Sequence, residues 1–327
     1  MGGSDPVVKV EAGDRQYELV EGWGKLPEGW TWGQVAGVAC DSQDRVHVYA
    51  RTEHPYMVFD KTGNMVHHGG ENSFDQAHSL YIDDADSVFV LSHRGHFIMK
   101  FDKDGELMLT LGEQGKAADT GYTKEGRVPF SPWASGGGIP TVNGVTKGGP
   151  PFNQPTDVAV APNGDIFVSD GYRNCKVHKF AADGRLIKSW GDPGNAKDLR
   201  NTTDSPGLFH TPHGIWVEGE RVYVLDRENN RIQIFTTDGD FVSMWTELER
   251  PTDMYVDSDG VAYISELEDH VSIRDLDGNV IGRFGSERSN APGKFWGPHC
   301  IWVDSSGDMY VGEVLEGQRL QKFARCK

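Results

Sequence analysis

The amino-acid sequence of 327 residues predicts an all-β protein of the six-bladed β-propeller class. The first observation that predicts this fold is an internal repeat of strand-length apolar runs, with four clear copies and two weaker ones. In chain order the copies begin near Ala36, Ala77, Pro155, Pro212, Pro251 and Pro298. Six copies of a unit of about 40–45 residues are typical of a propeller, in which each copy folds as one four-stranded blade.

The second observation is that every copy contains the same succession of four expected strands, a to d. In the fourth copy, strand a covers 215–217, strand b covers 222–225 and strand c covers 231–235. An Asp-Gly pair follows strand c in most copies, and this pair is a strong signal for a tight hairpin. These turns are Lys103-Asp-Gly105, Ala182-Asp-Gly184, Thr237-Asp-Gly239 and Leu276-Asp-Gly278.

The third observation concerns the two chain ends. The sixth copy stops after Lys322-Phe323, which is its strand c, whereas residues 17–24 have the pattern of a strand d without the strands before it. We therefore expect the N-terminal strand to complete the last blade and close the ring, since closure removes exposed strand edges. Residues 1–327 are expected to form a single domain, with a Gly/Pro-rich insertion or lid at 111–151.

Composition and charge exclude several classes of partner. The chain has 49 acidic and 32 basic residues, a formal net charge of −17, which argues against binding of a nucleic acid. No apolar run approaches the length of a membrane span, and no secretory signal is visible at the N-terminus. The four cysteines are far apart, so we expect a reducing, cytoplasmic setting.

One position of the repeat carries three histidines. The residue at the start of strand a reads, from the first copy to the sixth, Ala36, His78, Thr156, His213, Thr252 and His299. Equivalent positions on alternate blades of a six-bladed ring form a triangle around the central channel, so the three imidazoles should converge. Three imidazoles with an open fourth position are typical of a catalytic Zn²⁺ site, although Fe, Co, Ni or Mn can occupy such sites. Nothing in the sequence marks the following histidines as metal ligands: His67, His68, His93, His96 and His178.

Residues that directly follow strand b should lie at the same end of the propeller as the three histidines. In register these are Arg51, His93, Gly171 with Tyr172, and Arg227. Two guanidinium groups, a phenol and a further imidazole would therefore surround the metal. The acidic residues that end strand b are expected to brace the following loop instead of acting in catalysis; they are Asp170, Asp226, Glu266 and Glu313.

These residues resemble the peptidyl-α-hydroxyglycine α-amidating lyase family, a branch of the NHL-repeat propellers. The resemblance is carried by residues 152–160, 168–172, 212–213 and 226–233. The lyase of this family is a six-bladed propeller with a zinc ion held by three histidines. The resemblance places these ligands, the functional tyrosine and the two functional arginines at His78, His213, His299, Tyr172, Arg51 and Arg227.

Three departures from the family pattern bear on cofactor and substrate. Cys300 stands where the family has an acidic residue, which makes a structural Ca²⁺ near the carbonyls of Val38 and Leu80 doubtful. His93 replaces part of an acidic turn of the family, and the insertion at 111–151 is longer than the family pattern predicts. These differences indicate a related pocket with a different substrate.

The pattern as a whole predicts a zinc-dependent lyase that cleaves the C–N bond of a carbinolamide-type (N-acyl hemiaminal) substrate. The products would be an amide and an aldehyde or keto acid, and the substrate a small molecule or a peptide-like molecule. Tyr172 would act in proton transfer, while Arg51 and Arg227 would orient a carboxylate or carbonyl. A metal-dependent hydrolase of a lactone, ester or amide is the alternative, with His93 as an additional base. A non-catalytic interaction scaffold is the third hypothesis, and the oligomeric state stays open.

Overall fold

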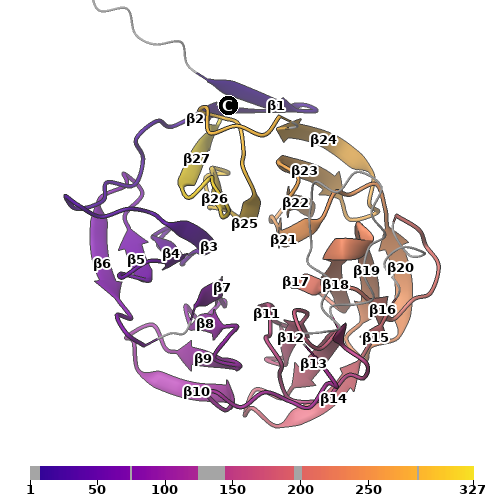
Figure 1. Ribbon diagram of the computed structural model, residues 1–327. Helices are drawn as coiled ribbons and strands as arrows, with labels where there is room; N and C mark the ends of the chain where they lie inside the picture. Colours follow the sequence, from indigo (N-terminus) through magenta and orange to yellow (C-terminus); the bar gives the residue numbers. More distant parts are fainter. Residues whose placement is uncertain (1–7, 74–75, 124–143, 195–200, 286) are drawn as a thin grey trace, which may run out of the picture. The chain divides into compact units, whose positions relative to one another are not determined.

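The structure is a computed structural model that describes residues 8–73, 76–123, 144–194, 201–285 and 287–327 (Figure 1). These residues form strands and connecting loops, with one short 3₁₀ helix and no α-helix in any of the described ranges. No helix in this part of the chain is long and apolar enough to cross a lipid bilayer. Five four-stranded blades and one five-stranded blade account for nearly all strands, which confirms the predicted class, the six-bladed β-propeller.

The six blades follow one another along the chain, and in the first five the strands are hydrogen-bonded in sequence order. The first blade contains β3 (Gln34–Cys40), β4 (Val46–Arg51), β5 (Tyr56–Phe59) and β6 (Met65–Gly69). The second contains β7 (Ala77–Ile82), β8 (Val88–Ser92), β9 (Phe97–Phe101) and β10 (Leu107–Gly112). The third contains β11 (Asp157–Val160), β12 (Ile166–Asp170), β13 (Lys176–Phe180) and β14 (Leu186–Trp190).

The second half of the chain repeats this arrangement. The fourth blade contains β17 (Pro212–Glu218), β18 (Arg221–Asp226), β19 (Arg231–Thr236) and β20 (Phe241–Trp245), with the 3₁₀ helix η2 (Arg227–Asn229) after β18. The fifth contains β21 (Pro251–Val256), β22 (Val261–Glu266), β23 (His270–Asp275) and β24 (Val280–Gly285). The sixth contains β25 (Pro298–Val303), β26 (Met309–Glu313) and β27 (Leu320–Arg325). Two short strands, β15 (Asp192–Pro193) and β16 (Leu208–Phe209), form a separate parallel pair.

The Asp-Gly turns lie between the third and fourth strands, as the sequence predicts. Their glycines have positive φ angles, for example +87° at Gly184 and +91° at Gly278. This backbone conformation is strained for residues with a β-carbon, which explains why glycine recurs at the position. Of the insertion expected at 111–151, the first two residues belong to β10, and residues 124–143 lie outside the described ranges.

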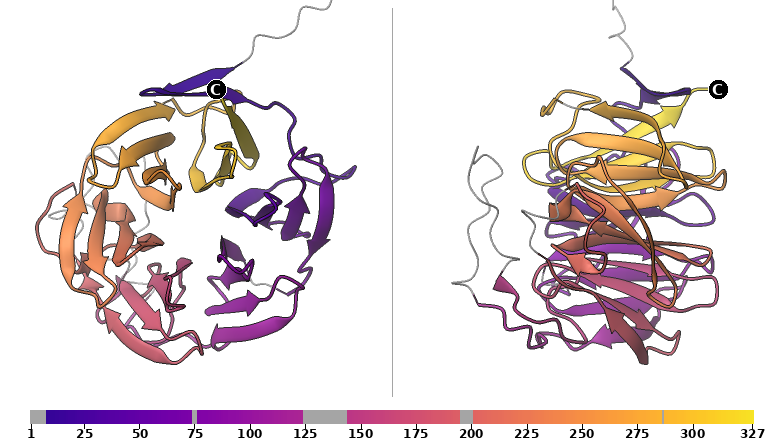
Figure 2. Two further views of the ribbon diagram at one scale, coloured as in Figure 1. Left: turned by 180° about the vertical axis from the view of Figure 1, so that it is seen from behind. Right: turned by 90° about the vertical axis from the view of Figure 1, so that its right-hand side faces the viewer.

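The N-terminal segment supplies the outer strands of the sixth blade. Strand β2 (Arg15–Leu19) pairs antiparallel with β27, and β1 (Lys9–Ala12) adds a fifth strand beyond it. Figure 2 shows the two indigo strands beside the yellow last blade. Strand β2 begins two residues before the expected range of 17–24 and ends within it. The repeat did not predict β1. Closure of a ring by this strand stays a prediction.

The described residues divide into two compact units, each with its own apolar packing. One unit comprises the chain up to Glu71 together with residues from Met254 onward, and the other comprises Asn72–Asp253. In the second unit, buried side chains of the second, third and fourth blades, such as Phe167 and Phe235, pack between neighbouring sheets. In the first unit, the corresponding side chains join the fifth, sixth and first blades. The single domain expected from the sequence stays a prediction.

One half-buried carboxyl group connects the first strands of three blades in the second unit. Asp157 on β11 accepts a hydrogen bond from the Ser79 hydroxyl on β7 and another, of 2.8 Å, from the backbone N–H of Ile215 on β17. Burial raises the pKa of Asp157 to about 7, and the two hydrogen bonds only partly oppose this effect. Folding therefore favours the protonated form of Asp157, because partial removal from water penalises the charged carboxylate.

Replacement of Tyr17 tests the contribution of the N-terminal strand. Tyr17 on β2 is fully buried, among side chains that include Tyr263 and Phe323. Tyr17→Ala should lower the free energy of unfolding by about 3–5 kcal/mol, since a large buried side chain is lost. Gln16, its exposed neighbour on the same strand, provides the control, and Gln16→Ala should change the value by less than about 0.5 kcal/mol. Urea unfolding measures both, and equal stabilities would show that β2 adds little to the blade.

The raised pKa of Asp157 predicts a pH dependence of stability. Because the pKa in the folded protein lies above its value of about 3.9 in the unfolded chain, folding favours the protonated form. The contribution of Asp157 to the free energy of unfolding is complete below pH 4. It is lost as the pH rises to about 7, at up to about 1.4 kcal/mol per pH unit.

Asp157→Asn should therefore flatten the profile between pH 4 and pH 7, whereas Asp183→Asn, on an exposed turn, should follow the wild type. Urea unfolding at a series of pH values measures the difference. Parallel profiles for wild type and Asp157→Asn would contradict the assignment.

Candidate active site

Two of the three predicted histidines lie at irregularities of their strands in the second unit. The pairing of β7 with β8 shifts register between Ala77 and Ser79, and that of β17 with β18 shifts between Pro212 and Ile215. His78 and His213 occupy these β-bulges, which change the direction of a side chain relative to the regular ladder. Both imidazoles are almost completely buried, and their ring centroids are 4.9 Å apart. The structure thus brings together two residues separated by more than a hundred positions.

Each histidine is oriented by a backbone carbonyl at the first strand of the next blade. His78 Nδ1 donates to the carbonyl oxygen of Thr156 at 2.7 Å, and His213 Nδ1 donates to that of Thr252 at 2.8 Å. A carbonyl can only accept, so the proton lies on Nδ1 and the lone pair on Nε2. This is the tautomer that a metal-binding histidine requires, and such second hydrogen bonds are usual for metal ligands.

His299 repeats this local arrangement within the first unit. It lies at a register shift between Pro298 and Cys300 on β25, is buried, and its Nδ1 donates to the carbonyl of Ala36 at 3.0 Å. The three acceptors occupy the equivalent repeat positions on the blades that carry no histidine. The repeat therefore fixes both the place and the tautomer of all three imidazoles.

The phenol of Tyr172 meets the two histidines of the second unit. Its oxygen lies 2.8 Å from His78 Nε2 and 3.1 Å from His213 Nε2. One hydroxyl proton can serve only one of these nitrogens at a time, so lone pairs outnumber protons around the oxygen. An electron-rich group of two Nε2 atoms and a phenol oxygen is suited to a cation, which makes the residues a good fit to a transition metal.

Gly171 allows the turn after β12 to bring Tyr172 to this position. A β-carbon at residue 171 would lie 2.0 Å from the carbonyl oxygen of Pro212, the residue that precedes His213. Contacts this short do not occur, so any other residue would push the turn away from β17. The sequence Gly171-Tyr172 therefore couples the position of the phenol to that of the histidine strand.

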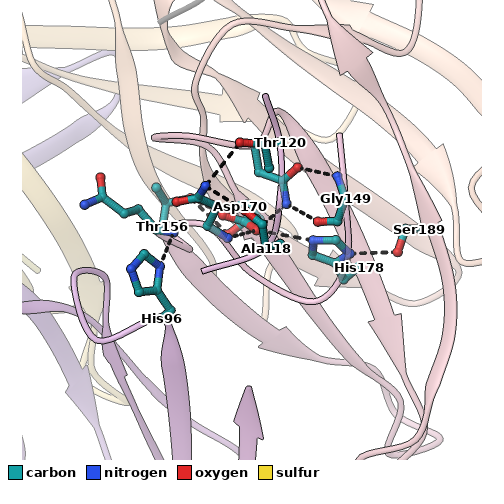
Figure 3. Close-up of polar contacts among 12 residues, drawn as sticks. His96, Ala118, Thr120, Gly149, Thr156, Asp170, His178 and Ser189 are labelled. Atoms are coloured by element: carbon teal, nitrogen blue, oxygen red, sulfur yellow. Dashed lines mark hydrogen bonds and ion pairs between the residues drawn. The ribbon is translucent and has the colours of Figure 1, made fainter. Parts of the chain in front are cut away.

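A buried carboxylate holds the base of the same turn (Figure 3). Asp170 accepts hydrogen bonds from the backbone N–H of Asn153 at 2.8 Å and from the side-chain amide of Asn174 at 2.6 Å. Asn153 in turn donates to the carbonyl of Ala118, and Asn174 exchanges two hydrogen bonds with the backbone of Gly149. The described ends of the long insertion are thus fastened to the turn that carries Tyr172. This network confirms the bracing role expected for Asp170.

Arg227 lies against Tyr172 and is held by a neighbouring acid. Its guanidinium carbon is 5.5 Å from the centre of the Tyr172 ring, and its Nε donates to Glu228 at 2.8 Å. Glu228 also pairs with Arg250, at 2.9 Å, so one carboxylate orients two guanidinium groups. Burial opposes the charge of Arg227, but Glu228 and Tyr172 together outweigh this effect, so the pKa of Arg227 lies above its ordinary value.

His93 joins the same group of side chains. It is buried in the turn after β8, with its ring centroid 5.1 Å from that of His78 and 5.3 Å from that of Tyr172. Within the second unit, the structure therefore brings together His78, His93, Tyr172, His213 and Arg227. The shared repeat register had indicated all five.

Arg51 ends β4 in the first unit, as expected from its register. It is half-buried, and its guanidinium group donates to Gln34 at 2.6 Å. The sequence indicates Glu228 or Asp226 as a partner of Arg227, and the structure selects Glu228. Gln34, which orients Arg51, was not recognised from the sequence, because this contact follows only from the pairing of β3 with β4.

The cysteines are all free thiols, and Cys40, Cys175 and Cys300 are buried. The Cys300 thiol lies 3.8 Å from the carbonyl oxygen of Val35, its acceptor within the first unit. A neutral thiol at this position supplies no carboxylate for a Ca²⁺ ion, which is consistent with the departure seen in the sequence.

Comparisons with known proteins identify the repeat and similar enzymes. The NHL repeat model matches residues 152–180 and 209–235. A peptidyl-glycine α-amidating monooxygenase of Xenopus laevis is 30% identical over 192 residues, which cover 54% of this chain and 21% of that protein. Peptidyl-α-hydroxyglycine α-amidating lyase 1 of Drosophila melanogaster is 29% identical over 197 residues, 53% of this chain and 35% of the fly protein. The chain thus spans about a fifth of the length of the first of these relatives.

Solved structures support the fold. A gluconolactonase of Xanthomonas campestris superposes with a TM-score of 0.62 over 99% of this chain and 96% of its own, at 15% identity. At this identity the likeness concerns the fold alone.

Proposed function

We propose, for a chain of NHL repeats that resembles the peptidyl-α-hydroxyglycine α-amidating lyases, a zinc-dependent C–N lyase activity. The observation that carries the proposal is the group formed by His78, His213 and Tyr172, in which two correctly oriented Nε2 atoms share one phenol oxygen. The substrate would be a carbinolamide-type molecule, either small or peptide-like, and the products an amide and an aldehyde or keto acid.

His299 would complete the metal site as its third ligand. Three facts support this: the shared repeat position, the burial of all three imidazoles, and the matching hydrogen bond from each Nδ1 to a carbonyl. A bound Zn²⁺ would supply a Lewis acid that favours ionisation of a substrate hydroxyl. Fe, Co, Ni and Mn remain alternatives, since imidazole accepts each of them.

Tyr172 would move the proton that the reaction must transfer. In R–CO–NH–CH(OH)–R′, the hydroxyl loses a proton, its C–O bond becomes a carbonyl, and the C–N bond breaks with its electron pair on nitrogen. The amide nitrogen then requires a proton. The Tyr172 hydroxyl could give its own proton to that nitrogen and take the proton of the substrate hydroxyl, which leaves the enzyme unchanged.

The arginines would position the substrate. Arg227 is charged and held rigidly by Glu228 beside the Tyr172 ring, so its remaining N–H groups can direct a carboxylate or carbonyl toward the phenol. Arg51 is likewise proposed to orient a substrate carboxylate or carbonyl. A guanidinium group suits this task because it presents paired donors in a fixed plane.

A hydrolase is the second candidate, and His93 is the observation that favours it. A buried imidazole about 5 Å from both His78 and Tyr172 could serve as a base for water attack on a lactone, ester or amide. A non-catalytic scaffold would not require the convergence of imidazoles, phenol and guanidinium seen in the second unit. The cytoplasmic location inferred from the sequence stays a proposal.

Metal analysis tests the first part of the proposal. After extensive dialysis, the wild-type protein should retain about one zinc per chain, and His213→Ala should retain far less, because one of three ligands is lost. His67→Ala, which removes an exposed imidazole, should keep the wild-type content. Elemental analysis of the three proteins gives the result. A wild type that stays metal-free after addition of zinc would overturn the metalloenzyme proposal.

Replacement of Tyr172 tests the proton transfer. Tyr172→Phe should lower kcat by about 10²–10⁴-fold for a carbinolamide substrate, with the metal content unchanged, because only the proton-carrying oxygen is removed. Full activity in a metal-loaded Tyr172→Phe protein would exclude this role. Parallel assays with lactone and ester substrates, with His93→Ala as the second variant, distinguish the lyase from the hydrolase. A hydrolase should depend on His93, and a lyase should not cleave these substrates.

A further inference from the structure

A second group of metal-ligating side chains lies in the first blade. His54 is in the loop between β4 and β5, His68 is on β6, and Glu71 follows β6 by two residues. None of the three belongs to the repeat position that carries the buried histidines. All lie within the first unit, and they are partly exposed, with 30%, 50% and 37% of their side-chain surfaces accessible.

The two imidazoles converge on one carboxylate oxygen. The Nδ1 atoms of His54 and His68 each lie 3.0 Å from Glu71 Oε1. One ligand atom from each residue is within 4.8 Å of the others, so a single ion could contact all three.

Trp30 orients the imidazole of His54. The indole and imidazole rings are stacked, with centroids 3.5 Å apart and planes within 5° of each other. The indole also meets His68 edge-on, at 5.1 Å between the centroids. Because an aromatic ring fixes the position of one ligand and contacts the second, the group is less mobile than three exposed side chains alone would be.

We propose that His54, His68 and Glu71 form a second metal site that binds a divalent transition ion such as Zn²⁺, Ni²⁺ or Cu²⁺. The ion would replace the two Nδ1 protons that now point to Glu71, and each imidazole would carry its proton on Nε2 instead. Two nitrogen ligands and one carboxylate oxygen match the preferences of these ions, whereas Mg²⁺ and Ca²⁺ prefer oxygen alone. The exposure of the group leaves further coordination positions open to water or to an external ligand.

The site should bind its ion more weakly than the three buried histidines would, because its ligands are exposed and fewer second hydrogen bonds fix them. Titration with metal should therefore reveal it after the first equivalent has been bound. The protein is first loaded with one equivalent of Zn²⁺, and a second addition of Zn²⁺ is then followed by isothermal titration calorimetry.

The wild type should bind one further equivalent, whereas His68→Ala and Glu71→Gln should lose it or bind it at least about tenfold more weakly. Glu71→Gln preserves the shape of the side chain, so it tests the ligand even if His68→Ala perturbs β6. His67→Ala is the matched control, since His67 is the exposed neighbour on the same strand and its ring lies beside Tyr56 instead. This variant should bind the second equivalent as the wild type does.

Fluorescence supplies a readout that locates the ion. Cu²⁺ quenches a nearby indole, so Cu²⁺ added to the zinc-loaded protein should quench part of the tryptophan emission. This part should be absent in Trp30→Phe and in Glu71→Gln but present in His67→Ala. Equal binding of the second equivalent by wild type, His68→Ala and Glu71→Gln would overturn the proposal. Quenching that is unchanged in Trp30→Phe would do the same.

Discussion

The candidate active site depends on one constraint, a hydrogen bond from the Nδ1 atom of a histidine to a backbone carbonyl at the first strand of the next blade. His78 and His213 make this bond to Thr156 and Thr252. The bond fixes the ring, determines which nitrogen carries the proton, and directs Nε2 toward Tyr172. Because the acceptor is a backbone atom, its position follows from the sheet and does not depend on the side chain at residue 156 or 252. The chemistry of the site is thus set by strand geometry.

The sequence predicts the class of fold and most of the site because both follow from the repeat. A fixed position in each copy indicates which side chains share a location, and this was sufficient to group His78, Tyr172, His213 and Arg227. The β-bulges could not be predicted in this way. A register shift of one residue depends on how two strands pair, and no residue type at Ala77 or Ser79 requires it.

Other parts escaped prediction for equally physical reasons. Gln34 contacts Arg51 because β3 and β4 are adjacent, and a glutamine at the start of a strand has no signal of its own. His54, His68 and Glu71 meet through a loop and a strand end, outside any repeated position. His68 had been set aside for that reason. The additional strand β1 pairs with a strand that is already at the end of the blade, so the four-strand pattern leaves no place for it.

The pairing of β2 with β27 has a consequence for the order of folding. Tyr17 and Arg325 are partners in this ladder although 308 residues separate them in the chain. At a synthesis rate of about 5–20 residues per second, the N-terminal strand waits roughly 15–60 s on the ribosome before its partner is made. Contacts of such long range also slow folding in general. The sixth blade is therefore the last to assemble, and until then the edge of β2 that will pair with β27 is open to pairing with other chains.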